Sequence, residues 1–332
     1  MQQERKELSG RQAGWFESGE ALSAHTGGGH PLEVSNVIIA HRTLEDARLQ
    51  GVTFRNVTWD AIHGDRTSWD HSVVEDSDIT RSDFRDAVFR NVTFKRVHFH
   101  HVNMVDATLE NVHFVECNFD DVVMTYLHGG EVVFDHAQFP KLEINGEENN
   151  FSGSSNQLVF RDTDLTWPVF THLEPGASLT FINSTVENGN IGHGHIDEIE
   201  SKDSHLELAG PRTSVGQLDI TGGYTAVRFS ESKVGTISVK DTALELLNAL
   251  QGSTVGSFHV SGCRKPENPA SYYGISLGDV IVAPSDPHDS SHFGKVTISD
   301  CTDVPLHLQF VVSQKLTVRN VSAPLFMLRK SA

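Results

Sequence analysis

From Val34 to Ile144, an apolar residue returns at every fifth position of the chain. The series consists of Val34, Ile39, Leu44, Leu49, Phe54, Trp59, Trp69, Val74, Ile79, Phe84, Phe89, Phe94, Phe99, Met104, Leu109, Phe114, Phe119, Met124, Phe134, Phe139 and Ile144, and only Gly64 and Gly129 interrupt it. A small or apolar residue stands two positions before nearly every member, and Arg42 is the misfit. This period fits neither a helix nor an ordinary strand. It therefore predicts a repeating structural unit.

A chain that turns one residue inward at every fifth position closes a four-sided coil in about twenty residues. Phe84, Phe89, Phe94 and Phe99 then fill the four sides of one layer. Stacked coils bond through their backbones at a spacing of about 4.8 Å. Because one coil cannot bury its own apolar face, the stack is the stable unit.

Three segments carry a specific resemblance: AVFRNVTF from Ala87, ATLENVHF from Ala107 and CNFDDVVM from Cys117. They resemble the pentapeptide repeat family, whose members form a right-handed quadrilateral β-helix. The family usually has Ala two positions before the central residue and Asp or Asn one before it. Here Val often replaces Ala, and Thr, His or Val often replaces Asp. The resemblance covers roughly a third of the chain and implies an all-β, right-handed β-helix solenoid.

The second half loses the strict five-residue phase but keeps a spacing of about twenty residues between alternating apolar pairs. These pairs are Leu158/Phe160, Leu179/Phe181, Leu218/Ile220, Ile237/Val239, Phe258/Val260, Val280/Val282, Val296/Ile298 and Leu316/Val318, with a weaker member at Ile196/Ile199. We interpret them as further coils, and the alternative is an unrelated β-sandwich with evenly spaced strands. The segment from Thr242 to Leu250 has helical propensity but also fits one side of a coil.

Three regions follow from these patterns: an N-terminal tail or cap over 1–30, pentapeptide repeats over 31–146, and less regular coils over 147–332 with long loops at 263–293. The final stretch contains the apolar residues Val321, Leu325, Phe326, Met327 and Leu328. An exposed stack end needs a cover. These residues therefore either fold over the last coil or form a homodimer with a second molecule.

Cysteine usage and hydropathy favour a reduced, cytoplasmic protein. No run of eighteen apolar residues is present, and three cysteines do not make a disulfide framework. Cys117 occupies an inward position of the repeat. Cys263 and Cys301 stand two layers apart if Asp279 to Val282 forms an intervening coil, and they are neighbours that could bond if this segment is an excursion.

The net charge of −18 argues against nucleic-acid binding and permits the opposite idea, that the protein imitates nucleic acid. The family resemblance gives this idea a target, because some members of the family resemble duplex DNA to topoisomerases. Residues twenty apart stack on one face, and their charges alternate in sign. The predicted ladders are Asp70/Arg90/Glu110, Asp76/Arg96/Glu116, Glu75/Lys95 and Asp65/Arg85. Such pairs cancel the continuous negative field that a DNA mimic needs.

Histidines gather at two places, His98/His100/His101 and His193/His195. A metal site needs three converging ligands. The pattern favours polar surface at both places, so we predict neither a metal nor a cofactor.

The segment 263–293 differs in composition from the rest of the chain, with four prolines and many Ser and Asp residues. Long loops on a rigid scaffold are often binding sites. The candidate partner-binding residues are Arg264, Lys265, Tyr272, Tyr273, Asp286, His288, Asp289 and His292.

Catalytic motifs are missing from the sequence: there is no defensible Ser-His-Asp order, phosphate-binding glycine loop or Cys-x-x-Cys. We therefore expect a non-enzymatic, protein-binding β-helix. Members of the resembled family are thought to block or shield partner enzymes or to accompany toxins and secretion systems. This implies an immunity-type binder of a basic toxin or nuclease. Secreted effectors or adaptors and polysaccharide-active β-helix enzymes are the alternatives.

Overall fold

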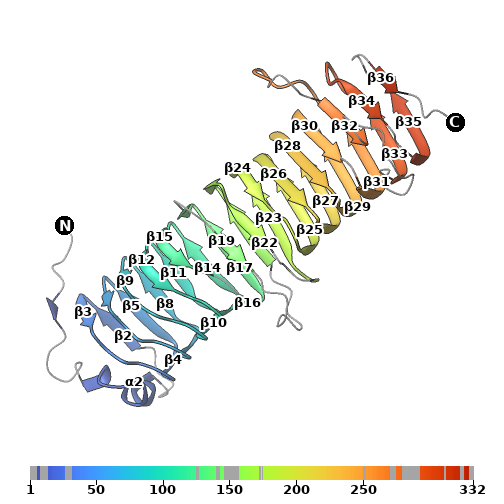
Figure 1. Ribbon diagram of the computed structural model, residues 1–332. Helices are drawn as coiled ribbons and strands as arrows, with labels where there is room; N and C mark the ends of the chain where they lie inside the picture. Colours follow the sequence, from blue (N-terminus) through green and yellow to red (C-terminus); the bar gives the residue numbers. More distant parts are fainter. Residues whose placement is uncertain are drawn as a thin grey trace. The chain divides into compact units, whose positions relative to one another are not determined.

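The computed structural model places most of the chain in parallel β-strands, and it divides into two compact units, Met1–Leu165 and Thr166–Ala332 (Figure 1). Each unit is a β-solenoid. The structure describes residues 6–7, 14–26, 32–124, 127–139, 143–145, 157–171, 173, 175–249, 252–269, 274–278, 292–309, 312–321 and 325–328. Within these residues no helix is long and apolar enough to cross a membrane.

Unit 1 is a stack of four-sided coils, of which three sides form continuous parallel sheets. The first sheet contains β1 (Lys6–Glu7), β3 (Val37–Ala40), β6 (Thr58–Asp60), β9 (Asp78–Thr80), β12 (His98–Asn103), β15 (Asn118–Val123), β18 (Gln138–Phe139) and β21 (Asp164–Thr166). The second contains β2 (Leu32–Ser35), β5 (Val52–Arg55), β8 (Val73–Glu75), β11 (Thr93–Lys95), β14 (Val112–Val115), β17 (Glu131–Asp135) and β20 (Gln157–Arg161). The third contains β4 (Arg48–Gln50), β7 (Ser68–Asp70), β10 (Val88–Arg90), β13 (Thr108–Glu110) and β16 (His128–Gly129).

The fourth side of unit 1 is held by single bridges between residues one coil apart, Thr43, His63, Asp83 and Asn103. A further short strand is β19 (Glu143–Asn145). Strand partners from β2 to β17 are twenty positions apart, as in Leu32↔Val52 and Val112↔Val132. The five-residue period is thus one side of a coil.

The core of unit 1 consists of the predicted series, whose apolar members from Val34 to Phe139 are buried. The side of the coil that carries β11, β14, β17 and β20 stacks phenylalanines face to face. Phe94, Phe114, Phe134 and Phe160 follow one another at ring-centroid distances of 5.1 Å with interplanar angles of 7 to 9°. The coil repeat therefore sets the ring spacing in the core.

The corners of unit 1 use the left-handed backbone region at every fifth position, beginning with Asn36, His41 and Asp46. A non-glycine residue enters this region at a cost of about 1 kcal/mol, and Asn and Asp tolerate it best. The hydrogen-bonded ladder compensates for this cost at each corner, for example through the Asn36 amide donating to the Arg55 carbonyl at 3.1 Å.

The two glycines that interrupt the apolar series are required by packing. A Cβ at Gly64 would lie 2.7 Å from the Phe84 ring, so this ring fills the space that an inward side chain would take. A Cβ at Gly129 would lie 2.0 Å from the Leu109 carbonyl oxygen, and φ there is +137°. The interruptions therefore keep the coils in register.

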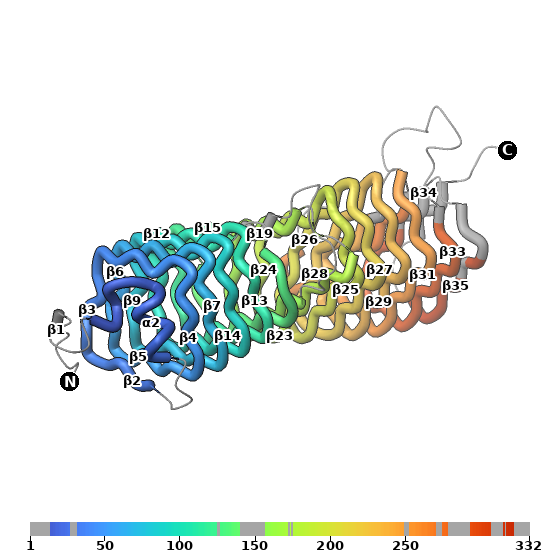
Figure 2. Tube along the Cα trace, turned by 90° about the horizontal axis from the view of Figure 1, so that it is seen from below, coloured from blue at the N-terminus to red at the C-terminus, as the bar shows by residue number. Residues whose placement is uncertain are grey.

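Residues 14–26 cover the first coils of unit 1 (Figure 2). Helix α2 (Gly19–Thr26) begins after Ser18, whose hydroxyl accepts a hydrogen bond from the Ala21 amide at 3.1 Å. Phe16 is fully buried, with its ring 6.0 Å from Trp59. This segment shields an apolar stack end from water.

Unit 2 contains two long parallel sheets. One consists of β22 (Val169–Thr171), β24 (Thr185–Asn190), β26 (His205–Pro211), β28 (Tyr224–Ser230), β30 (Ala243–Ala249), β32 (Gly274–Gly278), β34 (Leu306–Gln309) and β36 (Leu325–Leu328). The other consists of β23 (Ser178–Ile182), β25 (His195–Lys202), β27 (Ser214–Thr221), β29 (Lys233–Lys240), β31 (Thr254–Ser261), β33 (His292–Ser299) and β35 (Val312–Arg319). These pairings confirm further coils and exclude the sandwich alternative.

Two details refine the sequence interpretation of unit 2. The weak pair is Ile199/Ser201, because Ile199 aligns with Leu179 and Leu218 while Ser201 aligns with Ile220. The segment from Thr242 forms strand β30 rather than a helix, since it pairs with β28. The pair Val280/Val282 lies outside the described residues.

Cys263 and Cys301 are neighbours. The strands before them pair as Ser261↔Ser299, and the residues after them bridge as Arg264↔Thr302. Both thiols are free and buried. The two cysteines therefore follow adjacent strands of one sheet, and they do not stand two layers apart.

Candidate groove on unit 2

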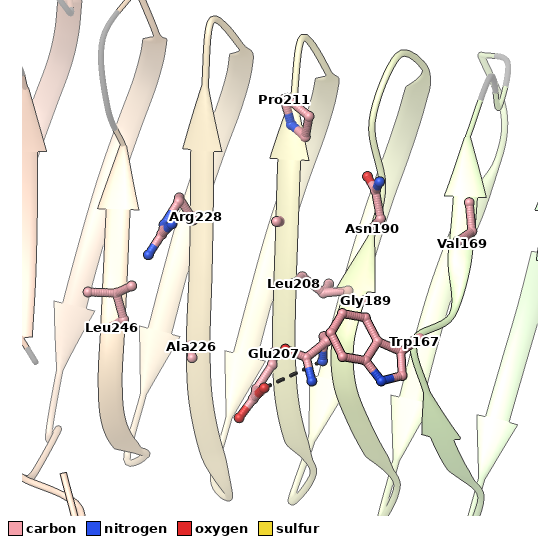
Figure 3. A pocket seen from close by; sticks show the side chains of 12 residues that line it. Trp167, Val169, Gly189, Asn190, Glu207, Leu208, Pro211, Ala226, Arg228 and Leu246 are labelled. Atoms are coloured by element: carbon pink, nitrogen blue, oxygen red, sulfur yellow. Dashed lines mark hydrogen bonds between the residues drawn. The ribbon is translucent and has the colours of Figure 1, made fainter. Parts of the chain in front are cut away.

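A groove of about 540 Å³ crosses the outer face of one sheet of unit 2, from the residues before β22 to β30 (Figure 3). Its lining residues are Trp167, Val169, Asn188, Gly189, Asn190, Glu207, Leu208, Ala209, Pro211, Ala226, Arg228 and Leu246. Most of its surface is apolar, with polar groups at a few points. This composition is typical of binding sites in which polar groups set specificity.

Trp167 is the most exposed large apolar residue of the described chain, at 64%; the other exposed one is Val123, at 43%. Its φ of +56° puts it at a left-handed corner, where the chain mostly has Asn, Asp, His or Arg. The Trp167 amide donates to the Glu187 carbonyl at 2.8 Å, which fixes the corner. An indole at such a position carries a strain of about 1 kcal/mol, because bulky residues disfavour positive φ.

The groove is hollow because small side chains face outward on its floor. In β26 and β28 the outward positions include Ala209 and Ala226. Register shifts lie on both sides, between Val186 and Gly189 in β24, and opposite Thr225 where Glu245 is the extra residue of β30. Such bulges redirect side chains and recur beside binding sites.

The carboxylate of Glu207 is held from two directions. Its Oε2 accepts the Asn188 amide at 3.4 Å, and its Oε1 lies 3.1 Å from Nε2 of His205 (Figure 3 shows the first contact). The His205 ring stacks on Tyr224 at 4.2 Å. Burial, reinforced by nearby Glu245 and Glu207, raises the pKa of Tyr224 to about 12, so its hydroxyl stays protonated. The two contacts of Glu207 therefore hold its carboxylate in one position before any ligand binds.

Arg228 supplies the positive charge of the groove. It is exposed, lies opposite Ala209 in the strand register, and forms no ion pair with the residues that the structure describes. Arginine and tryptophan are enriched among residues that dominate protein interfaces. The groove thus combines one aromatic face, one anchored carboxylate and one cation.

None of the binding residues predicted from the sequence lines this groove, and most of them lie outside the residues that the structure describes. Arg264 and Lys265 are exposed, but neither lines the groove. His292 begins β33. The other predicted residues, Tyr272, Tyr273, Asp286, His288 and Asp289, lie outside the described residues. Binding through 263–293 therefore stays a prediction.

The residues of the groove were missed by the sequence analysis because each is ordinary by itself. One signal was available: a tryptophan followed by proline, placed where corners elsewhere carry polar residues. Glu207 and Arg228 stand in neighbouring strands and become neighbours of Trp167 only through stacking.

The outer surface of unit 1 carries the predicted charge pairing. Arg90 bonds Glu110 and Arg96 bonds Asp76, both at 2.6 Å between adjacent coils. The predicted pairs Asp65/Arg85 and Glu75/Lys95 form no ion pair among the described residues, because Arg85 bonds Asp83 of its own coil at 3.1 Å and Glu75 bonds Arg55 at 3.2 Å.

Asp65 has a buried Oδ1 without a hydrogen-bond partner among the described residues, and burial raises the pKa of its carboxyl group. The arginine pairs interrupt the negative charge of this surface, which is a physical argument against DNA mimicry.

Comparisons with known proteins agree on the repeat. A family model described as pentapeptide repeats matches residues 75–111 in eight copies. No curated protein sequence matches the chain significantly.

Among solved structures, HetL, a pentapeptide repeat protein involved in heterocyst differentiation regulation from the cyanobacterium Nostoc, is 11% identical with a TM-score of 0.33; the match covers 75% of this chain and 97% of HetL. A mannuronic acid specific polysaccharide lyase from human gut microbiota is 10% identical with a TM-score of 0.30, covering 96% of this chain and 82% of the lyase. PfbA, a surface adhesin of Streptococcus pneumoniae, is 8% identical with a TM-score of 0.27, covering 92% of this chain and 88% of the adhesin.

The matched segment lies wholly within unit 1, where burial and corners repeat every five residues. The family model and the structure therefore place the five-residue repeat in the same unit. Residues 75–111 are pentapeptide repeats, which confirms the family resemblance drawn from the sequence.

Proposed function

We propose that this protein binds another protein through the groove around Trp167 and neutralises it, as an immunity protein neutralises a toxin. The observation that carries the proposal is the exposed indole, which stands at a strained corner above an apolar floor. A solvent-exposed tryptophan contributes nothing to the core. When a partner covers it, it buries on the order of 200 Å².

The charges of the chain favour a basic partner. The net charge is −18, and long-range attraction by such a charge accelerates association with a cationic protein. Within the groove, Glu207 offers an anchored acceptor for one arginine or lysine of the partner. Arg228 then disfavours a second cationic residue of the partner next to the first, because the two positive charges repel each other.

The scaffold supports binding by limiting the entropic cost of association. The groove is built on strands whose backbones are bonded to a neighbouring strand on both sides, from β24 to β28, with a bulge at each flank. Side chains on such strands are already ordered before a partner arrives, and preorganisation of this kind improves affinity.

Two substitutions test the proposal. Trp167→Asn removes the indole and supplies a residue that the corner prefers, so the fold is retained. Val123→Asn removes the other exposed apolar side chain and serves as the control. The tagged full chain and both variants are used to capture proteins from cells of the native host, and the partner's own activity is then titrated with the purified chain.

The proposal predicts a basic protein that is captured by the wild type and by Val123→Asn, is lost with Trp167→Asn, and is inactivated at a one-to-one ratio. Capture that weakens between low and high salt supports electrostatic steering. Equal capture by both variants places the interface elsewhere. A captured protein whose activity is unchanged refutes neutralisation.

A polysaccharide ligand is the second candidate, because Arg228, Glu207 and an exposed indole ring share one groove. Indoles stack on sugar rings, and arginine binds the carboxylates of acidic sugars. Trp59 and Trp69 are buried and Trp15 is half-buried, so Trp167 is the most exposed tryptophan among the described residues. Quenching by uronic acid oligosaccharides that disappears with Trp167→Asn favours this candidate.

A further inference from the structure

We propose that His98, His100 and Asp120 form a binding site for a divalent transition metal of the Zn²⁺ class on the outer surface of unit 1. The candidate ligand atoms of these three side chains all lie within 4.8 Å of one another. This differs from the plain polar surface expected from the sequence, and it is independent of the groove.

The strand register produces this convergence. His98 and His100 project outward from β12 on the same side, because Phe99 between them is fully buried. In β15, Asn118 stands opposite His98 and Asp120 opposite His100. Two imidazoles and one carboxylate are therefore brought to one face by two adjacent coils.

The distances between the three side chains fit a metal ion that takes the place of the proton shared by His100 and Asp120. Nδ1 of His100 lies 2.7 Å from Oδ2 of Asp120, and the His98 and His100 ring centroids are 5.9 Å apart. With metal–ligand bonds of about 2.0–2.1 Å in a tetrahedron, neighbouring ligand atoms are roughly 3.3 Å apart. Small rotations of the side chains reach this separation. Two nitrogens and one oxygen leave a fourth position for water.

The base of the site is rigid. Phe99 and Phe119 lie directly beneath the two strands and stack at 4.9 Å with an interplanar angle of 6°. This stack and the ladder between β12 and β15 fix the separation of the ligand-bearing strands. A site on such elements loses little entropy when it binds a metal.

The neighbouring groups add negative charge around the site. On the preceding coil Asp78 and Thr80 are opposite His98 and His100. At the corner, His101 contacts Asp121, and its ring lies 3.9 Å from that of His100. Carboxylates around the site favour a cation, and hydrogen bonds from imidazole to carboxylate are typical around metal ligands.

The test is titration of the full chain, carrying no histidine tag, with zinc chloride in competition with a chromophoric chelator. The expected result is one bound equivalent, with affinity lowered at least about 10-fold by His98→Ala, His100→Ala or the near-isosteric Asp120→Asn. All three side chains face outward, so far-UV circular dichroism should remain unchanged.

Two controls isolate the site. His71→Ala removes an imidazole whose Nδ1 lies 2.7 Å from Oδ1 of the adjacent Asp70. His136→Ala removes the imidazole of the second candidate cluster found among the described residues, with Asp135 and Asp162. Both are expected to bind zinc as the wild type does. Co²⁺ in place of zinc should give the visible absorption of tetrahedral coordination. No saturable binding, or equal affinity of the His98→Ala and wild-type chains, overturns the proposal.

Discussion

Replacement of Phe114 by alanine is expected to destabilise unit 1 by about 4–5 kcal/mol. The ring is fully buried and stacks between Phe94 and Phe134, at 5.1 Å and 7° on either side. Phe119 packs edge-on against it at 5.2 Å. Substitutions of this type cost about 3–5 kcal/mol in general.

The upper end of this range follows from the architecture. A cavity costs less where surrounding groups can collapse into it. Here β14, which carries Phe114, is bonded in register to β11 and β17, so neither neighbouring coil can move toward the gap. Phe114→Leu keeps most of the buried area but loses the aromatic contacts, each worth about 0.5–1.5 kcal/mol, and is expected to cost about 2 kcal/mol.

Urea unfolding followed by circular dichroism measures the change, and hydrogen exchange shows where it acts. Repeat proteins open locally, so the faster exchange should be confined to unit 1. Phe258→Ala is the matched control in unit 2, because this buried ring has one described aromatic neighbour, Phe293, at 6.5 Å. It is expected to cost about 3 kcal/mol and to affect unit 2. A cost below about 1 kcal/mol for Phe114→Ala, or equal costs for Ala and Leu, refutes the reasoning.

Three further predictions concern the backbone, acid and the groove. Gly129→Ala should lower stability by about 3 kcal/mol because its Cβ meets the Leu109 carbonyl, whereas Gly130→Ala, which meets nothing within 4 Å, should have little effect in a thermal melt. The hydrogen bond from Arg96 lowers the pKa of Asp76 in the folded protein. The stability that this bond confers is therefore present above the unfolded pKa of about 3.9 and is lost as the pH falls through the folded pKa. Asp76→Asn should reduce this loss of stability in acid, as measured by urea unfolding at several pH values. Trp167→Asn should stabilise unit 2 by about 1 kcal/mol by relieving positive φ, and an equal or lower midpoint in urea would contradict the strain.

The fold of unit 1 was predictable because the same small pattern recurs in every side of the coil. Each inward residue, such as Phe94, is confirmed by a neighbour five positions away and by another twenty positions away. The coils of unit 2 retain only the second signal, and even this varies. Steps from His195 to Ser214 and from Lys233 to Thr254 are 19 and 21 residues.

The groove was not predictable from local pattern. Its floor depends on outward alanines, and outward positions carry no periodic signal because water tolerates almost any residue there. Its bulges depend on single extra residues such as Glu245, and a spacing of about twenty residues between apolar pairs does not show where one extra residue is inserted. The histidine cluster was visible in the sequence, but its third ligand, Asp120, was recognisable only as a stacked neighbour.

The coil between β31 and β33 has a consequence for how such a chain changes over time. Thr254 pairs with His292, a step of 38 residues, yet the next step from His292 to Val312 returns to 20. The sheet thus absorbs about a full coil length of additional sequence without altering the alignment of the strands on either side. Lengthening a loop costs only about 0.6 kcal/mol per doubling. A solenoid of this kind can therefore gain, lose or exchange whole surface segments in single genetic steps while its core sequence stays fixed.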